Sequence, residues 1–106
     1  MPKYMVEASY TVEGLKGLQR DKATGRRMAI SQAVAAAGGR LETFYCALGE
    51  RDVVLIMDMP DLVAVTALSL AISATGLAHT KTTALLTVEE TDEALEMSIA
   101  YRGPGR

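Results

Sequence analysis

The chain is poor in the residues that build several common kinds of site. Its 106 residues include one cysteine, one histidine, one phenylalanine, three prolines and no tryptophan. A lone cysteine, Cys46, excludes an intrachain disulfide and a cysteine-based zinc cluster within one chain. With a single histidine besides, we expect no metal site, and the cysteine usage indicates a reducing, cytoplasmic setting. Phosphate loops of the G-x-x-x-x-G-K and G-x-G-x-x-G types are missing, so we expect no bound cofactor.

Positive charge and long apolar runs are also scarce. Eleven Lys and Arg face thirteen Asp and Glu, a net charge of −2, whereas nucleic-acid binders rely on many cations that contact phosphate. Residues 62–80 carry no charge, but Gly76 is expected to end their helix well short of the roughly 20 residues of a membrane span. Glu7 lies too early to leave room for the apolar core of a signal peptide. We therefore expect neither nucleic acid nor a membrane as a partner.

What is present is a globular pattern, with 49% hydrophobic residues. Period-two alternation and apolar content predict strands, and helical periodicity with capping residues predicts helices. The predicted strands are 3–11, 41–48, 53–57 and about 79–87. The first predicted helix runs from Thr11 to Gly38-Gly39, with an interruption at 21–25. The second runs from about 61 to 75, with Pro60 and Asp61 in the entry turn, and the third runs from a Thr87/Glu90 capping box to about 97. We expect one domain over residues 1–98 and a tail over 99–106.

The resulting order, β-α-β-β-α-β plus a terminal helix, predicts an α+β ferredoxin-like sandwich. Both main helices would cover one face of a four-stranded antiparallel sheet and leave the other face open. The third strand (53–57) is apolar on both sides, which is typical of a strand covered on both faces. The second helix is apolar on most of its circumference. Because one small domain cannot cover both, we expect a homo-oligomer formed through the open sheet face and the second helix.

Several residues in this order carry a family resemblance. They are the strand Tyr4-Met5-Val6, the helix start Thr11…Gly14, Arg26-Arg27 before Ile30, Gly38-Gly39, Tyr45, Gly49-x-x-Asp52 followed by Val53-Val54-Leu55, and Pro60-Asp61. Over about residues 3–90 the chain resembles the GYD-domain family, small ferredoxin-like proteins without an assigned reaction. It departs from the family at the signature itself, where Arg51 stands in place of the tyrosine. Residues 21–25 also lack the usual proline.

The resemblance implies an uncharacterised GYD-domain protein that serves as an oligomeric interaction module or a small-ligand-binding module. No catalytic machinery is identifiable in the sequence. The alternative is a cofactor-less or haem-handling enzyme of the dimeric α+β barrel type, which would use a cavity between subunits.

The hairpin loop holds the first candidate ligand-binding residues, Glu50, Arg51 and Asp52. These side chains would line a binding edge. The favoured interpretation is turn geometry, in which Gly49 adopts a positive φ and the Asp52 carboxylate accepts backbone N–H groups within the turn.

The fourth strand holds the candidate catalytic residues. His79 and Lys81 share one face of that strand, and the fold brings Glu7 of the first strand beside them on the open sheet face. Together they would form an acid–base cluster. The favoured alternative is a cross-strand ion pair within an oligomer interface.

The first helix concentrates positive charge. Residues 1–40 contain seven cations and three anions, whereas residues 41–106 contain four and ten. Arg26 or Arg27 would hold a small anionic ligand, a carboxylate or phosphate, near the helix interruption. The favoured alternative is that this basic region faces the acidic C-terminal helix within or between subunits.

Two other side chains complete the set. Tyr45 is a further ligand-binding candidate, although both Tyr45 and Tyr10 fit core or interface positions better than stacking platforms. Cys46 is expected to be a small buried hydrophobe.

Overall fold

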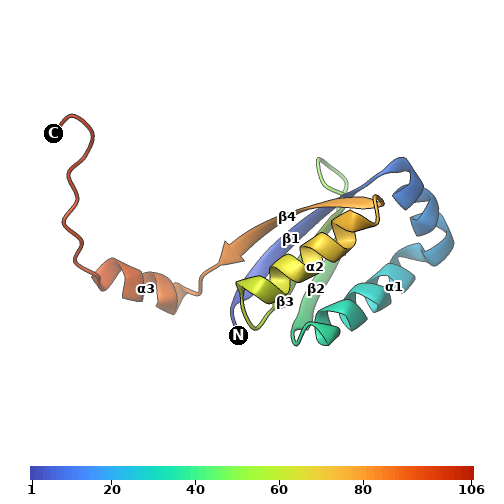
Figure 1. Ribbon diagram of the computed structural model, residues 1–106, viewed down its shortest axis with the longest axis horizontal. Coiled ribbons are helices and arrows are strands. Elements are labelled where there is room, and N and C mark those ends of the chain that lie inside the picture. Colours follow the sequence, from blue (N-terminus) through green and yellow to red (C-terminus); the bar gives the residue numbers. More distant parts are fainter.

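The structure, a computed structural model, describes residues 1–106. Seven elements follow one another along the chain (Figure 1). They are β1 (Lys3–Tyr10), α1 (Val12–Ala36), β2 (Arg40–Cys46), β3 (Val53–Asp58), α2 (Leu62–Ala74), β4 (Ala78–Leu85) and α3 (Val88–Glu96). This is the predicted order, and the ends of the elements differ from the predicted ends by small displacements.

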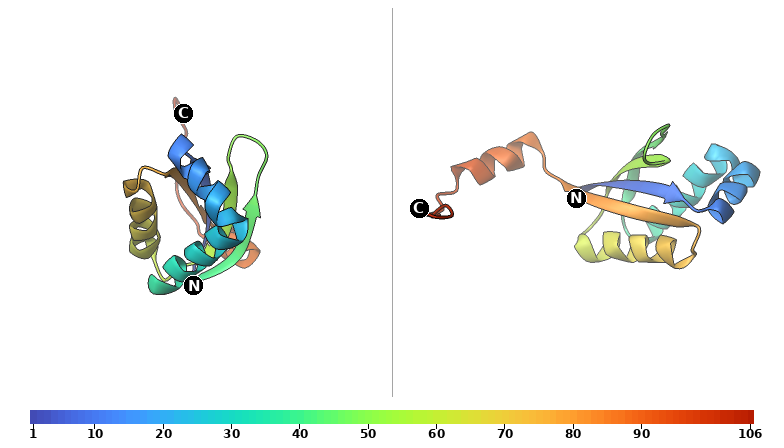
Figure 2. Two further views of the ribbon diagram at one scale, coloured as in Figure 1. Left: turned by 90° about the vertical axis from the view of Figure 1, so that its right-hand side faces the viewer. Right: turned by 90° about the horizontal axis from the view of Figure 1, so that it is seen from above.

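The four strands form one antiparallel sheet in the spatial order β2-β3-β1-β4. Val6 of β1 pairs with Leu55 of β3 on one side and Thr82 of β4 on the other, so the first strand of the chain lies inside the sheet. Both α1 and α2 pack over one face of this sheet (Figures 1 and 2). The fold is the predicted α+β ferredoxin-like sandwich, and its other face carries no helix.

The core lies between the sheet and these two helices. Its buried members are Tyr4, Val6, Ile30, Val34, Val53, Leu55, Met57, Met59, Val65 and Leu68. Truncating a buried aliphatic side chain to alanine typically costs about 2–5 kcal/mol, so these contacts decide which face the helices cover. The opposite side of β3 differs, because Val54 and Ile56 are only half-buried. The expected cover on both faces of β3 is therefore not supplied within one chain.

A polar side chain caps the start of each helix, and for α1 and α3 it is the residue that the sequence indicates. The Thr11 hydroxyl accepts the Gly14 N–H at 3.2 Å, and the Asp61 carboxylate accepts the Ala64 N–H at 2.8 Å. Thr87 and Glu90 form the reciprocal capping box. Asp61 was expected inside the first turn of α2, but it is the N-cap and the helix begins one residue later. Each such cap stabilises its helix by about 1 kcal/mol.

A sharp change of direction divides α1. Lys22 has φ 61° and ψ 171°, so the helical path breaks there, within the predicted interruption at residues 21–25. The segment before the break docks on the turn between α2 and β4: Thr11 donates its N–H to the Leu77 carbonyl at 3.0 Å. The segment after the break lies along β2. Because of the break, one helix contacts two distant parts of the sheet layer.

Two expectations about single residues are wrong. Cys46 is an exposed free cysteine rather than a buried one, because it lies at the end of β2, an edge strand. Gly49 does not adopt a positive φ, which among the glycines is found only at Gly38, Gly76 and Gly105. The first of these, at φ 85°, follows the end of α1 as the sequence predicts.

One buried carboxylate organises an end of the open sheet face. Asp58 accepts hydrogen bonds from Lys3 Nζ at 2.8 Å and from Arg40 Nη2 at 3.0 Å. Lys3 also contacts Glu42 at 2.9 Å. The hydrogen bond from Lys3 lowers the pKa of Asp58 against the effect of burial, and it raises the pKa of Lys3. This cluster ties the start of β1 to β2 and β3.

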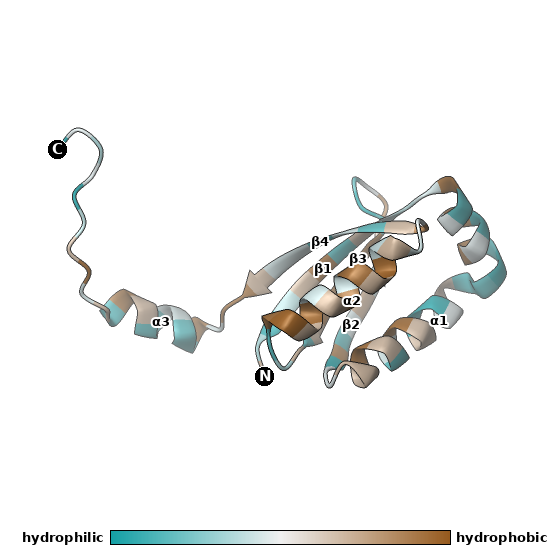
Figure 3. Cartoon of the chain, in the orientation of Figure 1, coloured by the Kyte–Doolittle hydropathy of each residue, from teal (hydrophilic) through white to brown (hydrophobic).

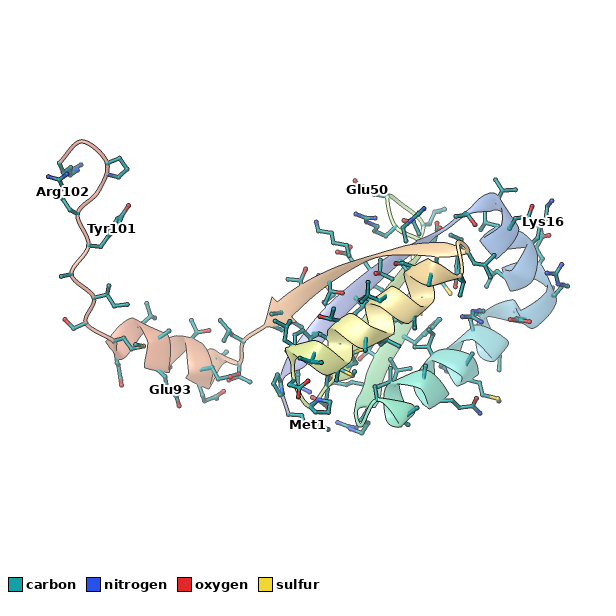
Figure 4. All side chains as sticks on the ribbon, in the orientation of Figure 1. Met1, Lys16, Glu50, Glu93, Tyr101 and Arg102 are labelled. Atoms are coloured by element: carbon teal, nitrogen blue, oxygen red, sulfur yellow. The ribbon has the colours of Figure 1, made fainter.

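The C-terminal helix stands apart from the rest of the molecule. None of its residues is buried, and α3 and the tail extend away from the sheet, giving the chain a longest dimension of 56 Å (Figure 2). Lys16 of α1 and Glu93 of α3 lie at opposite ends of the molecule (Figure 4). The expected pairing of the basic region with the acidic C-terminal helix is therefore wrong within one chain.

None of the helices is both long enough and apolar enough to cross a lipid bilayer.

Two glycines of α1 offer a matched test of this packing. A Cβ at Gly14 would overlap the Leu77 carbonyl, whereas a Cβ at Gly17 would meet nothing within 4 Å. We expect Gly14→Ala to destabilise the protein by about 2–3 kcal/mol. Gly17→Ala should stabilise it by about 0.5–1 kcal/mol, because alanine is the better helix former. Urea unfolding measures both, and equal effects at the two positions would contradict the close approach at Gly14.

The Asp58 cluster predicts a pH-dependent stability. Replacing this acceptor by Asp58→Asn should cost about 1–2 kcal/mol near neutral pH. Because the folded pKa is lowered, the contribution is fully present above the unfolded pKa of about 4 and is lost as the pH falls through the folded value. Unfolding measured near pH 7 and near pH 3 should therefore show the difference between variant and wild type shrinking in acid. A difference that stays constant would exclude the ion pairs as its source.

Candidate functional site

An apolar groove lies between α1 and α2. Its volume is about 300 Å³, at the lower end of ligand pockets, and ten of its fifteen lining residues are hydrophobic. Small residues leave this space open on the α1 side: Gly14, Gly17, Ala29 and Ala33. From the other side, α2 contributes Leu68, Ala71 and Ile72. The groove exists because α1 bends at Lys22 and each helix rests mainly on the sheet.

Four side chains with polar atoms line this groove: Tyr10, Asp21, Arg26 and Thr75. Arg26 Nη1 lies 3.5 Å from Asp21 Oδ2, a distance too long for a tight charge-assisted bond. The half-buried Tyr10 enters the groove from the end of β1. Burial raises the pKa of Tyr10, and the nearby Arg26 guanidinium opposes part of this rise. The groove therefore combines apolar walls with one cation, one carboxylate, one phenol and one hydroxyl.

The predicted pair Arg26 and Arg27 is divided between two surfaces. Neighbouring residues on a helix point about 100° apart. Arg26 accordingly lines the groove between the helices, whereas Arg27 is exposed and lines a more open depression between α1 and β2 together with Gln32 and Glu42. Arg26 thus shares a mostly apolar pocket, whereas only three of the nine residues around the Arg27 depression are hydrophobic.

The hairpin loop has a structural connection that the sequence did not reveal. The Asp52 carboxylate accepts the Tyr10 N–H at 2.8 Å, and its backbone N–H donates to the Ala8 carbonyl at 2.9 Å. The partner expected for Asp52 was an N–H within the turn, but the contact reaches across to β1. Glu50 is exposed on the loop (Figure 4), and Arg51 is half-buried. None of these three lines the groove, although Asp52 holds the end of β1 from which Tyr10 enters it.

The candidate catalytic residues do share the open sheet face, as expected. Glu7 pairs with Lys81 in the β1–β4 register, and Ser9 pairs with His79. His79 and Lys81 are exposed, and Glu7 and Lys81 form no ion pair. The predicted Tyr45 lies on the same face opposite Val54, with 68% of it exposed, so it is not a core residue. No group of three His, Cys, Asp or Glu side chains converges at one point.

Sequence reasoning missed Tyr10 and Asp21 as parts of one site with Arg26. The strand alternation marks Tyr10 as facing the helices, and the interruption at 21–25 marks Asp21 as close to a bend. The small residues at helical spacing on α1 were a further signal. Whether these small residues leave a groove open depends on how far apart the two helices lie, and the hydrophobic alternation does not reveal that distance.

The contact between Tyr10 and Arg26 predicts a titration difference. Removing the cation by Arg26→Met should move the pKa of Tyr10 further above its ordinary value, because burial then acts without opposition. Ultraviolet difference titration measures this, with Tyr10→Phe used to subtract the other three tyrosines. An unchanged Tyr10 titration in the arginine variant would show that the two groups are not neighbours.

Comparison with known proteins agrees with this architecture. The model of the GYD domain family matches residues 4–95 of the 106-residue chain. No curated protein and no solved structure matches the chain. The matched region runs from the first strand into α3 and includes every residue of the groove. The chain belongs to the GYD domain family.

Proposed function

We propose that this GYD-domain protein is an oligomeric module that binds a small ligand. The observation that carries the proposal is the amount of apolar surface that one copy leaves exposed. Exposed apolar patches of this kind on a monomer mark contact surfaces. Three separate surfaces contribute: the outer side of α2, the open sheet face and the C-terminal segment.

The outer side of α2 is the most apolar helix surface. Leu62, Val63 and Leu70 are 65%, 78% and 65% exposed, and no charged residue lies between them (Figure 3). A surface helix that needs to bury only one stripe normally carries polar residues on its other side. The apolar outer side therefore supports contact with a further protein surface.

The open sheet face combines an apolar centre with polar ends. Met5, Val54 and Ile56 are half-buried at its centre. The Asp58 cluster lies toward one end and Glu7, Lys81 and His79 lie toward the other. Because the same surface on a second copy presents the same pattern, a two-fold arrangement would bring apolar centre against apolar centre.

The C-terminal segment adds an apolar surface that was not among the contact surfaces expected from the sequence. On α3 the acidic residues occupy one side and Val88, Thr91 and Leu95 the other. The large apolar side chains of this segment are mostly exposed: Leu86, Val88, Leu95, Met97, Ile99 and Tyr101. An amphipathic helix gains most of its stability from packing its apolar side, so this segment also supports association.

The ligand-binding half of the proposal is supported by the groove between α1 and α2. It has the volume, the apolar walls and the few polar groups that small-molecule sites share. The enzyme alternative, with a cavity between subunits, would draw on Glu7, His79 and Lys81. The enzyme alternative stays a prediction, because its site needs a second sheet. The cytoplasmic location also stays a prediction.

Native mass spectrometry and light scattering at micromolar concentration test the association. We expect the wild-type mass to be a multiple of one chain. Ile56→Lys should lower the mass toward one chain, because a charge at the centre of a buried contact costs several kcal/mol. Met28→Lys is the matched control, since Met28 is an exposed apolar residue of α1 outside the three surfaces.

Circular dichroism checks that both variants keep the wild-type fold. Leu70→Lys gives a second test that leaves the sheet unchanged. A wild-type mass equal to one chain would refute the oligomeric half of the proposal.

A further inference from the structure

We propose that the groove between α1 and α2 binds a small molecule with an apolar body and a single carboxylate, which Arg26 and the Tyr10 hydroxyl hold. This inference rests on the ligand-binding half of the proposed function and specifies the chemical class of the ligand. The groove residues come from α1, α2 and the adjoining ends of β1 and β4. The ligand would thus lie between elements that the fold already holds in place.

The walls of the groove select an apolar body. Gly17, Ala29 and Ala33 face Ala71 and Ile72 across it, and none of these side chains offers a polar atom. An apolar group placed there leaves water without losing hydrogen bonds, and this burial stabilises the complex. The volume of about 300 Å³ limits that body to a short chain or a small ring system.

Arg26 supplies the charge that selects an anion. Its side chain is 30% exposed, and its one ion pair, to Asp21, spans 3.5 Å. A guanidinium has five N–H donors in a planar fork that matches the two oxygens of a carboxylate. Asp21 is exposed and holds few of these donors, so an incoming carboxylate can take the remaining ones in a bidentate contact.

Tyr10 supplies a second donor at the same end of the groove. A tyrosine hydroxyl is protonated at neutral pH and can donate to a carboxylate oxygen, and burial raises the pKa of Tyr10 further. The Asp52 carboxylate accepts the Tyr10 N–H and so holds this residue in place from outside the groove. Arginine and phenol together form a site for one anionic group next to apolar walls.

The same observations favour a carboxylate over a phosphate. Arg26 is the only cation among the lining residues, and the nearby Lys22 and Arg27 do not line the groove. A phosphate monoester carries close to two negative charges at neutral pH and is usually held by several donors and cations. One guanidinium beside one phenol matches a single negative charge better.

Isothermal titration with octanoate, octanol and octylamine tests the proposal on the full-length protein. The three probes share one chain and differ in head group. We expect octanoate to bind at least about tenfold more tightly than octanol, because a charge-assisted hydrogen bond contributes 1.4 kcal/mol or more. Octylamine should bind more weakly than octanol. Arg26→Met should abolish the preference for octanoate while leaving octanol binding unchanged, and the control Arg27→Met should keep the preference.

Two further variants test each half of the site separately. Gly17→Leu should weaken both octanoate and octanol, since the new side chain enters open space in the groove and favours the helix. Asp21→Asn should tighten octanoate several-fold and leave octanol unchanged, because it removes the anion that competes for Arg26. A tighter complex in this variant is not expected from a merely structural role of Asp21.

The outcomes separate the inference from the proposed function. Equal binding of octanoate and octanol, or a preference that survives Arg26→Met, would overturn the carboxylate site while leaving a ligand-binding groove. Binding that Gly17→Leu does not weaken would place the probes elsewhere and overturn the inference as well. If no probe binds, the ligand-binding half of the function falls with it. The mass of the wild-type assembly, measured on the same sample, reports on the oligomeric half independently.

Discussion

The packing of two helices onto one face of a twisted sheet is the constraint on which the other features depend. Val34 of α1 and Val65 of α2 are fully enclosed, in one core that also contains residues of β1 and β3. The sides of the two helices that face each other line the groove, where α1 presents mainly glycine and alanine and α2 presents Leu68, Ala71 and Ile72. The groove between the helices and the exposed outer side of α2 follow from that division of contacts.

The bend at Lys22 shapes the groove in two ways. It turns the first segment of α1 toward the turn between α2 and β4, where Gly14 meets the Leu77 carbonyl and closes one end of the groove. It also brings Asp21 and Arg26 within 3.5 Å. A straight helix would place residues five positions apart on different sides. The local break is therefore what gives the groove its polar end.

The charged regions and the apolar surfaces of this protein are each separated from one another in space. The net charge is nearly balanced, but cations gather on α1 and anions on α3. Since α3 stands away from its own body, these regions do not meet within one chain. The apolar surfaces of α2, the sheet and α3 are likewise separated. A protein with several unpaired surfaces of this kind is suited to assembly, which agrees with the proposed function.

By itself the sequence determined the order of the elements, the caps of α1 and α3, the break in α1, the fold and the family. These depend on short-range periodicity and on backbone hydrogen bonds within a few residues, as at Thr11 and Thr87. Only the tertiary structure decided that Arg26 and not Arg27 lines a groove, that Asp52 holds Tyr10, and that Cys46 is exposed. These outcomes depend on the distance between helices and on contacts between residues about 40 positions apart, and side-chain periodicity carries no information on either.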